Sequence, residues 1–240
     1  MRISGFNKLC LLDYPEKIAC ILFTSGCNYK CPFCQNSTLI DSNESLIDEK
    51  EIFDFLEKRK NILDGIVISG GEPTIQKDLK EFIIKVKKLG FKVKLDTNGS
   101  NPKILKELLD EELLDYVAMD IKDVLNNYYK ITGVKLVKVD NVEKSIELLK
   151  NSKIDFEFRT TVIKEYHDIR KLEKICKLVG KENKYYLQNF EISDNVLDKN
   201  LHGFTNEELK NMYQILKNKY KNLRVRGLSD TLLKEEIRNV

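Results

Sequence analysis

A chain of 240 residues, 42% of them apolar, is long enough to bury a core, and we expect residues 1–240 to form a single domain. The 41 basic and 38 acidic residues leave a net charge of only +3, which does not indicate a nucleic-acid-binding protein. No run of roughly eighteen apolar residues and no signal peptide is evident, so no membrane association is expected. We therefore expect a cytoplasmic protein whose six cysteines are metal ligands or buried thiols rather than disulfides.

The N-terminal residues 2–16 combine short apolar stretches with the turn-forming sequence Asp13-Tyr14-Pro15-Glu16. This pattern indicates a short hairpin that leads into residues 18–23, which are apolar and β-branched like a strand buried on both faces. Single cysteines in apolar segments are expected in the core, namely Cys10, Cys20 and Cys176.

Three further cysteines, Cys27, Cys31 and Cys34, follow that strand within eight residues. Pro32 prevents a regular helix across them, so a loop brings three thiolates together, and thiolates suit iron–sulfur clusters, zinc or copper(I). Three cysteines leave one iron of a cubane cluster open to a small molecule. A structural zinc site needs four ligands, so a zinc loop completed by Cys20 is the alternative.

Short apolar strands and helical stretches alternate along the rest of the chain. Helices are predicted over 45–60, 77–89, from Pro102, and over 141–150, 168–179 and 206–219. Strands are predicted to begin at residues 18, 66, 92, 116, 156 and 185. This spacing implies a parallel sheet with right-handed crossovers but too few units for a closed barrel of eight. The longest irregular connections, 123–140 and 191–205, are candidates for lids or partner-facing loops.

Each predicted strand ends in polar or glycine-rich residues. After the cysteines come Gly70-Gly71-Glu72-Pro73, Asp96 and Asn98, Asp120 and Lys122, Arg159 and Thr161, and Gln188 and Asn189. Because the carboxyl ends of parallel strands meet at one edge, these residues predict a site there. For the charged residues, salt bridges at the barrel rim are the alternative.

The pattern Cys-x3-Cys-x-Phe-Cys after a first strand, followed by Gly70-Gly71-Glu72, resembles the radical S-adenosylmethionine (SAM) enzymes. The resemblance is closer to their glycyl-radical-enzyme activating branch, and within it to activators of anaerobic ribonucleoside-triphosphate reductase. It extends from Leu11-Leu12-Asp13-Tyr14-Pro15 to Arg226-Gly227. It implies an α/β fold with a partial (β/α)6 TIM-type barrel, a [4Fe–4S] cluster on Cys27, Cys31 and Cys34, and SAM bound to the fourth iron.

By this resemblance, reductive cleavage of SAM gives a 5′-deoxyadenosyl radical, which abstracts hydrogen from a glycine of a partner enzyme. Flavodoxin or ferredoxin would donate the electron. The glycines and Glu72 match the motif for the SAM amino group, and Phe33 matches an adenine neighbour. The pyruvate formate-lyase activator pattern has histidines after the third cysteine and at the end of the sixth strand, where this chain has Gln35-Asn36 and Gln188-Asn189-Phe190. Gln188 or Asn189 could supply hydrogen bonds to adenine instead. The predicted cofactor-binding residues are Phe33, Cys34, Gln35, Gly70, Gly71, Glu72, Asp96, Asn98, Asp120, Ile121, Lys122 and Gln188. No catalytic residue beyond the cluster ligands is expected.

Two other functions stay open at this point. One is a radical SAM enzyme acting on a small molecule, as in 7-carboxy-7-deazaguanine synthase, and the other is a zinc-stabilised binding module. His167 and His202 fall in predicted loops and are interpreted as surface residues. Residues 224–227 are interpreted as a terminal strand and turn.

Overall fold

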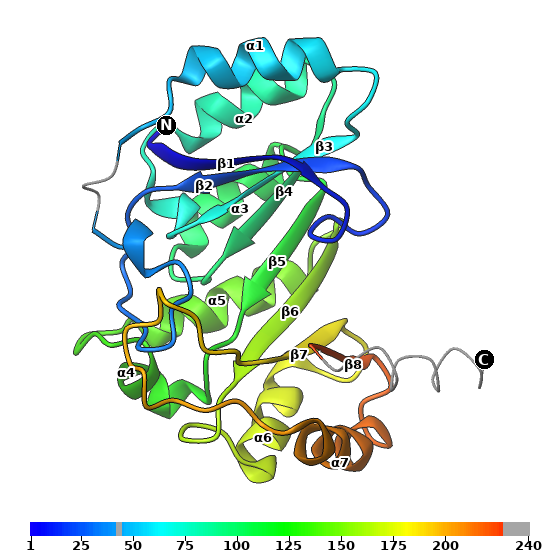
Figure 1. Cartoon of the computed structure of the whole chain (residues 1–240). Coiled ribbons are helices and arrows are strands. Elements are labelled where there is room, and N and C mark those ends of the chain that lie inside the picture. Colours follow the sequence, from blue (N-terminus) through cyan, green and yellow to red (C-terminus); the bar gives the residue numbers. More distant parts are fainter. Residues whose placement is uncertain (42–44, 228–240) are drawn as a thin grey trace.

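The computed structural model describes residues 1–41 and 45–227, which build one eight-stranded sheet in the order β1 to β8 (Figure 1). β1 (Ile3–Cys10) pairs antiparallel with β2 (Ala19–Thr24), which confirms the predicted hairpin. The other strands are β3 (Gly65–Gly70), β4 (Lys92–Thr97), β5 (Tyr116–Asp120), β6 (Asp155–Val162), β7 (Tyr185–Asn189) and β8 (Leu223–Arg226). Each pairs parallel with the strand before it.

The open sheet confirms the predicted partial barrel. β2 to β7 are the six predicted strands, and the predicted terminal strand β8 adds one more parallel strand. The helices are α1 (Glu49–Arg59), α2 (Leu79–Lys88), α3 (Pro102–Asp110), α4 (Tyr128–Ile131), α5 (Val139–Lys150), α6 (Ile169–Val179) and α7 (Asn206–Lys217). Short 3₁₀ turns are η1 (Ser37–Leu39), η2 (Pro73–Ile75) and η3 (Leu125–Asn127). No helix of the described residues is long and apolar enough to cross a membrane.

Two of these elements differ from the prediction. The first helix begins at residue 49 rather than 45, because the Asp48 side chain accepts a hydrogen bond from the Lys50 N–H and caps the helix there. The segment 123–140, predicted to be irregular, contains η3 and α4. Its Tyr128 and Ile131 are fully buried, so tertiary packing stabilises a helix too short to be evident from periodicity.

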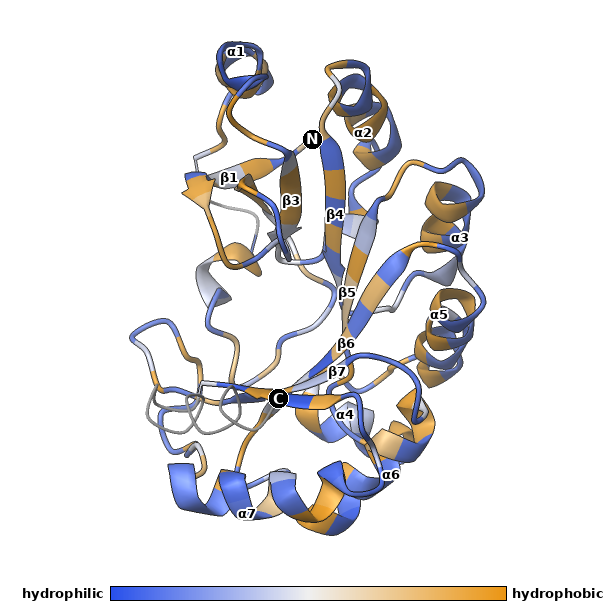
Figure 2. Cartoon of the chain, turned by 90° about the vertical axis from the view of Figure 1, so that its right-hand side faces the viewer, coloured by the Kyte–Doolittle hydropathy of each residue, from blue (hydrophilic) through white to orange (hydrophobic). Residues whose placement is uncertain are grey.

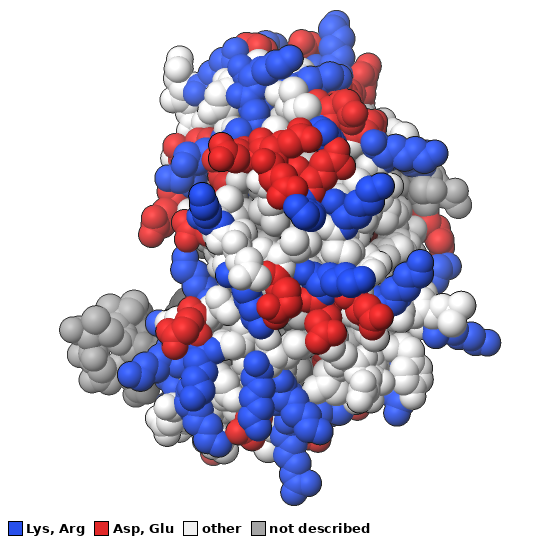
Figure 3. Space-filling model, turned by 180° about the vertical axis from the view of Figure 1, so that it is seen from behind, with Lys and Arg blue, Asp and Glu red and all other residues white. Residues whose placement is uncertain are grey.

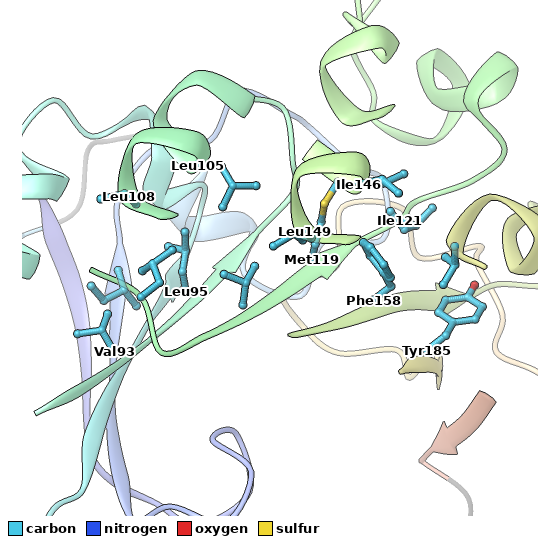
Figure 4. Packing of buried hydrophobic residues seen from close by; sticks show 14 of the residues in the cluster. Val93, Leu95, Leu105, Leu108, Met119, Ile121, Ile146, Leu149, Phe158 and Tyr185 are labelled. Atoms are coloured by element: carbon cyan, nitrogen blue, oxygen red, sulfur yellow. The ribbon is translucent and has the colours of Figure 1, made fainter. Parts of the chain in front are cut away.

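The main core lies between the sheet and the helices on its outer face. In Figure 2 the hydrophobic sides of the helices turn toward the sheet. Val93 and Leu95 of β4 pack there against Leu105 and Leu108 of α3, and Met119, Ile121 and Phe158 against Ile146 and Leu149 of α5 (Figure 4). The solvent side of this layer carries interspersed acidic and basic side chains (Figure 3), among them the ion pair Lys80–Glu107 between α2 and α3.

Part of the inner face of the sheet is apolar toward the amino ends of the strands. Ile21, Val67 and Ala118 form a small cluster there, and the hairpin loop adds Tyr14, whose ring centroid lies 6.0 Å from that of Tyr116. Tyr14 is only 4% exposed, so this loop fills the amino end of the barrel. The cavity-lining residues Asp96, Asp120 and Arg159 lie nearer the carboxyl ends of the strands. Lys94 and Glu157 are buried polar residues level with Tyr116 and Ala118.

Candidate functional site

A cavity of about 490 Å³ lies at the carboxyl ends of the strands. All predicted site residues except Ile121 line it, including the three cysteines, Gly70 to Glu72 and Gln188. The Ile121 side chain is fully buried on the outer face beside Met119 and Phe158 (Figure 4). Alternation along the chain explains this, because Asp120 and Lys122 face inward and the residue between them must face outward.

The cysteine loop, residues 24–41, is held between two distant segments. Cys31 and Phe33 are buried against Ile131 from one segment and Val196 from the other. Burial raises the pKa of Cys31 to about 12 and that of Cys27 to about 11, with Lys122 opposing the rise in both. No three His, Cys, Asp or Glu side chains of the described residues are close enough together to hold one metal ion. The ligands of a cubane cluster each bind a different iron.

The end of β3 fixes the start of this loop. The Gly71 N–H donates to the Thr24 carbonyl and the Glu72 N–H to the Gly26 carbonyl, each at 2.9 Å. A Cβ atom at position 71 would lie 2.0 Å from the Gly26 oxygen. Only glycine therefore allows the two backbones to approach this closely.

The single cysteines lie away from the loop. Cys20 is fully buried in the outer core, on the opposite face of β2 from Ile21. Cys10 lies in the inner apolar cluster, where its thiol donates to Asp13 at 2.5 Å, and Cys176 is buried on α6. Their expected core positions are confirmed, and a zinc loop completed by Cys20 does not fit this arrangement.

Glu72 follows β3, lines the cavity and is hydrogen-bonded to residues at the end of β4. Its side chain has no exposed surface. Its Oε1 accepts from the Thr74 N–H, the Thr74 hydroxyl and the Thr97 hydroxyl at 3.0, 2.6 and 2.7 Å, and its Oε2 accepts from the Asn98 N–H at 2.6 Å. Burial raises the pKa of Glu72 although these hydrogen bonds oppose the rise. Because each carboxylate oxygen has two lone pairs, Oε2 keeps one acceptor site for a cationic ligand.

Asn98 connects the end of β4 to the cysteine loop. Its side-chain amide donates to Asn28 Oδ1 at 2.9 Å, and its Oδ1 accepts from the Ser100 N–H at 2.9 Å. Asn98 is only 6% exposed. Although Asn98 lines the cavity, its side-chain nitrogen and oxygen already form hydrogen bonds within the protein.

Ion pairs across neighbouring strands form the wall opposite the loop. The Arg159 Nε donates to Asp120 at 2.9 Å and its Nη1 lies 3.4 Å from Asp96, while Lys122 pairs with Asp120 at 2.9 Å. Lys94, 1% exposed, also pairs with Asp96. Burial raises the pKa of Asp120, but Arg159 and Lys122 together outweigh it and hold that pKa well below its usual range. The charged residues that were predicted to bind the cofactor are thus the same residues that form the salt bridges of the alternative interpretation.

His167 is buried, and its interpretation as a surface residue is wrong. It is 3% exposed, its Nδ1 accepts from the Ile163 N–H at 3.1 Å, and its Nε2 lies 2.9 Å from the Lys122 carbonyl oxygen. Since Nδ1 accepts, Nε2 carries the proton and donates to Lys122. The Lys122 N–H donates to the Tyr128 hydroxyl at 3.0 Å, so both sides of this backbone are held. His202, by contrast, is exposed as expected and bonds Glu165.

The cavity is also lined by residues that the sequence did not indicate, among them Asp13, Arg226 and Gly227. Arg226 forms a two-pronged ion pair with the buried Glu157 at 2.8 and 2.9 Å and lies 3.8 Å from the Tyr186 ring centroid. Nothing in the sequence around Arg226 indicates that it lines the cavity. Only the pairing of β8 with β7 brings it to the cavity.

Sequence comparisons agree with this geometry. A family model described as the radical SAM superfamily matches residues 21–179. The chain is 35% identical over 238 residues to a Methanocaldococcus jannaschii protein named "Putative glycyl-radical enzyme activating enzyme", covering 95% of this chain and 97% of that one. It is also 29% identical over 153 residues to a "Probable GTP 3',8-cyclase" of Thermococcus kodakarensis, covering 62% of this chain and 48% of the cyclase.

Solved structures share the fold. A radical SAM methyltransferase from Sphaerobacter thermophilus superposes with a TM-score of 0.70 at 14% identity, over 92% of this chain and 70% of that one. Streptococcus suis SuiB superposes with a TM-score of 0.69 at 17% identity, over 86% of this chain and 48% of SuiB. The chain belongs to the radical SAM superfamily, whose cofactors are a [4Fe–4S] cluster and S-adenosylmethionine.

Proposed function

We propose that this radical SAM enzyme activates a glycyl-radical enzyme, and that its partner is an anaerobic ribonucleoside-triphosphate reductase. The observation that supports the activating role is the match to the M. jannaschii relative along 97% of that protein's length. The match to the T. kodakarensis cyclase covers less than half of the cyclase. The reductase is the partner that the sequence resemblance favours.

The residues of the loop fit the cluster. Cys27, Cys31 and Cys34 offer three soft ligands on one short segment, packed against apolar side chains. The raised pKa values of Cys27 and Cys31 mean that loading the metal releases protons. When bound, the cluster supplies the electron that cleaves SAM to methionine and the 5′-deoxyadenosyl radical.

The other cavity residues would bind and orient SAM. The free lone pair of Glu72 Oε2 can accept from the SAM ammonium, and the Lys122 ammonium can pair with its carboxylate. The Phe33 ring, 5.7 Å from Lys122 Nζ, offers an apolar surface for adenine. Asp120 is held ionised by Arg159 and Lys122, so it is suited to accept hydrogen bonds from ribose rather than to act as a base.

Anaerobic SAM cleavage tests the proposal. The reconstituted protein is mixed with dithionite and SAM, and 5′-deoxyadenosine is measured by chromatography. We expect Cys31→Ala to abolish its formation, because the cluster loses a ligand. Cys176→Ala, which removes a buried thiol on α6, should retain it once protein concentrations are matched. Full turnover by Cys31→Ala would contradict the proposed ligation.

The partner requires a separate measurement. After incubation with SAM and reductant, a candidate anaerobic reductase should show the doublet of a glycyl radical in electron paramagnetic resonance. Deuterium placed on its glycine should appear in 5′-deoxyadenosine. Consumption of GTP or of a deazaguanine precursor, with no radical on the reductase, would instead favour a small-molecule enzyme.

A further inference from the structure

We propose that residues 124–139, here called the lysine segment, form the docking surface for an acidic, low-potential one-electron carrier protein. This inference rests on the proposed function, because cleavage of SAM consumes an electron that must come from outside the chain. In the transfer the carrier is oxidised by one electron, which passes to the cluster on the cysteine loop. No proton or chemical group is exchanged between the two proteins.

The lysine segment packs directly on the cysteine loop. The Lys30 N–H, between the first two cysteines, donates to the Thr132 carbonyl at 2.8 Å. A Cβ at position 133 would lie 2.0 Å from the Lys30 oxygen, so the backbones meet where only glycine fits. Ile131 is fully buried beside Cys31. Because electron transfer slows steeply with distance, a carrier benefits from binding to a segment that contacts the cysteine loop directly.

The exposed surface of the lysine segment suits an acidic protein. Residues 124–139 contain three lysines and no acidic residue, although the whole chain is nearly balanced in charge. Of the two flanking aspartates, Asp123 is buried and Asp140 is exposed, so the surface keeps a net positive charge. Lys130, Lys135 and Lys138 are all exposed. Apolar contact area lies among them, since Tyr129 is 53% and Leu136 is 94% exposed. Aromatic and aliphatic contacts surrounded by charge are typical of protein–protein interfaces, and the charges steer the encounter.

The opposite side of the cysteine loop has the other sign. Residues 190–201 pack there, with the Asp198 N–H donating to the Pro32 carbonyl at 2.9 Å and the Gln35 amide to the Glu191 carbonyl at 3.0 Å. Residues 190–201 carry three acidic side chains, Glu191, Asp194 and Asp198, against one lysine, Lys199, and all except the half-buried Asp198 are exposed. An acidic carrier is therefore attracted to the lysine segment and repelled from the other side.

Docking on the lysine segment also leaves the cavity open. Glu191 lines the cavity, whereas the lining, as far as the chain is described, includes no residue of 124–139. The segment lies around α4, at the lower left in Figure 1. A carrier can therefore bind while the substrate occupies the cavity. A shared surface would force the two proteins to alternate.

Charge reversal tests the surface, with flavodoxin as the probe. One variant combines Lys130→Glu, Lys135→Glu and Lys138→Glu. The matched control combines Lys50→Glu, Lys58→Glu and Lys88→Glu, exposed lysines of α1 and α2 at the far end of the molecule (Figure 1). Calorimetry measures flavodoxin binding to the full chain, with and without the cluster. We expect the first variant to weaken the Kd about tenfold or more and the control less than about twofold, with salt weakening wild-type binding.

Turnover gives the second readout. With dithionite both variants should cleave SAM at the wild-type rate, whereas with reduced flavodoxin only the first should show a raised KM for the carrier. An unchanged Kd, or equal weakening in the control, overturns the docking surface. The docking surface is also overturned if the first variant loses binding to single-stranded DNA or to phosphatidylglycerol vesicles while its binding to flavodoxin is unchanged. A wild-type protein inactive with dithionite would refute the proposed function instead.

Discussion

The two walls of the cavity are built differently. The wall of β4 to β6 carries Asp96, Asp120 and Arg159, which sheet register places as neighbours, since Asp120 lies opposite Arg159 in the β5–β6 pair. The cysteine loop instead depends on segments far away in sequence and on close backbone contacts such as that of Gly71 with Gly26. Changes in the first wall should therefore mainly lower the free energy of unfolding. Changes in the supports of the loop should mainly impair cofactor loading.

Removing Arg159 should have the largest effect. Arg159→Met leaves Asp96 and Asp120, which are 12% and 31% exposed, without their shared partner. We expect a loss of about 3 kcal/mol in the free energy of unfolding, measured in urea, because buried carboxylates lose their compensating charge. Arg170→Met, an exposed change on α6, should cost less than about 0.5 kcal/mol. A loss for Arg159→Met as small as that of the control would mean that the wall is not held by its charges.

Gly71→Ala tests the support of the loop. The added methyl group would lie 2.0 Å from a backbone oxygen, so we expect a loss of about 2 kcal/mol in the free energy of unfolding. The iron bound after reconstitution should fall by a larger proportion than the stability does. The matched change is Gly90→Ala at the end of α2, where φ is +92° and no described atom lies within 4 Å. It should cost about 1 kcal/mol through backbone strain alone and leave the iron content unchanged. Equal iron contents would contradict the proposed difference between the walls.

The same contrast explains what could be predicted from the sequence. Strand ends and cysteine spacing are local patterns, so the partial barrel and nearly all the cavity residues were predictable. The side of a strand on which a residue lies also follows from alternation, and Ile121 was included despite it. His167 and Arg226 were missed because their partners, Lys122 and Glu157, are distant in sequence. The helical turn at Tyr128–Ile131 was missed because burial, not periodicity, stabilises it.

His167 joins the ends of β5 and β6 through the backbones of Lys122 and Ile163, and two amide substitutions separate its hydrogen bonds. His167→Asn keeps an acceptor for the Ile163 N–H but loses the donor to the Lys122 carbonyl, whereas His167→Gln keeps that donor. We expect each to lose about 1 to 2 kcal/mol of stability. Only His167→Asn should also raise the KM for SAM several-fold, because Lys122 is less well positioned. Equal KM values in the two variants would show that this bond does not position Lys122.

The smallest expected effect is a pH dependence of stability. Burial lowers the pKa of His167 below 6.5, with Asp123 opposing the shift and Lys171 adding to it. Below pH 6.5 the unfolded chain therefore binds a proton that the folded chain excludes, so stability falls as the pH drops through this window. Between about pH 7 and about pH 5.5 the wild type should lose up to roughly 1 kcal/mol more than His167→Gln. If His167→Gln loses as much stability as the wild type, the imidazole is protonated in the fold, and its Nδ1 cannot be the acceptor that fixes the Lys122 backbone.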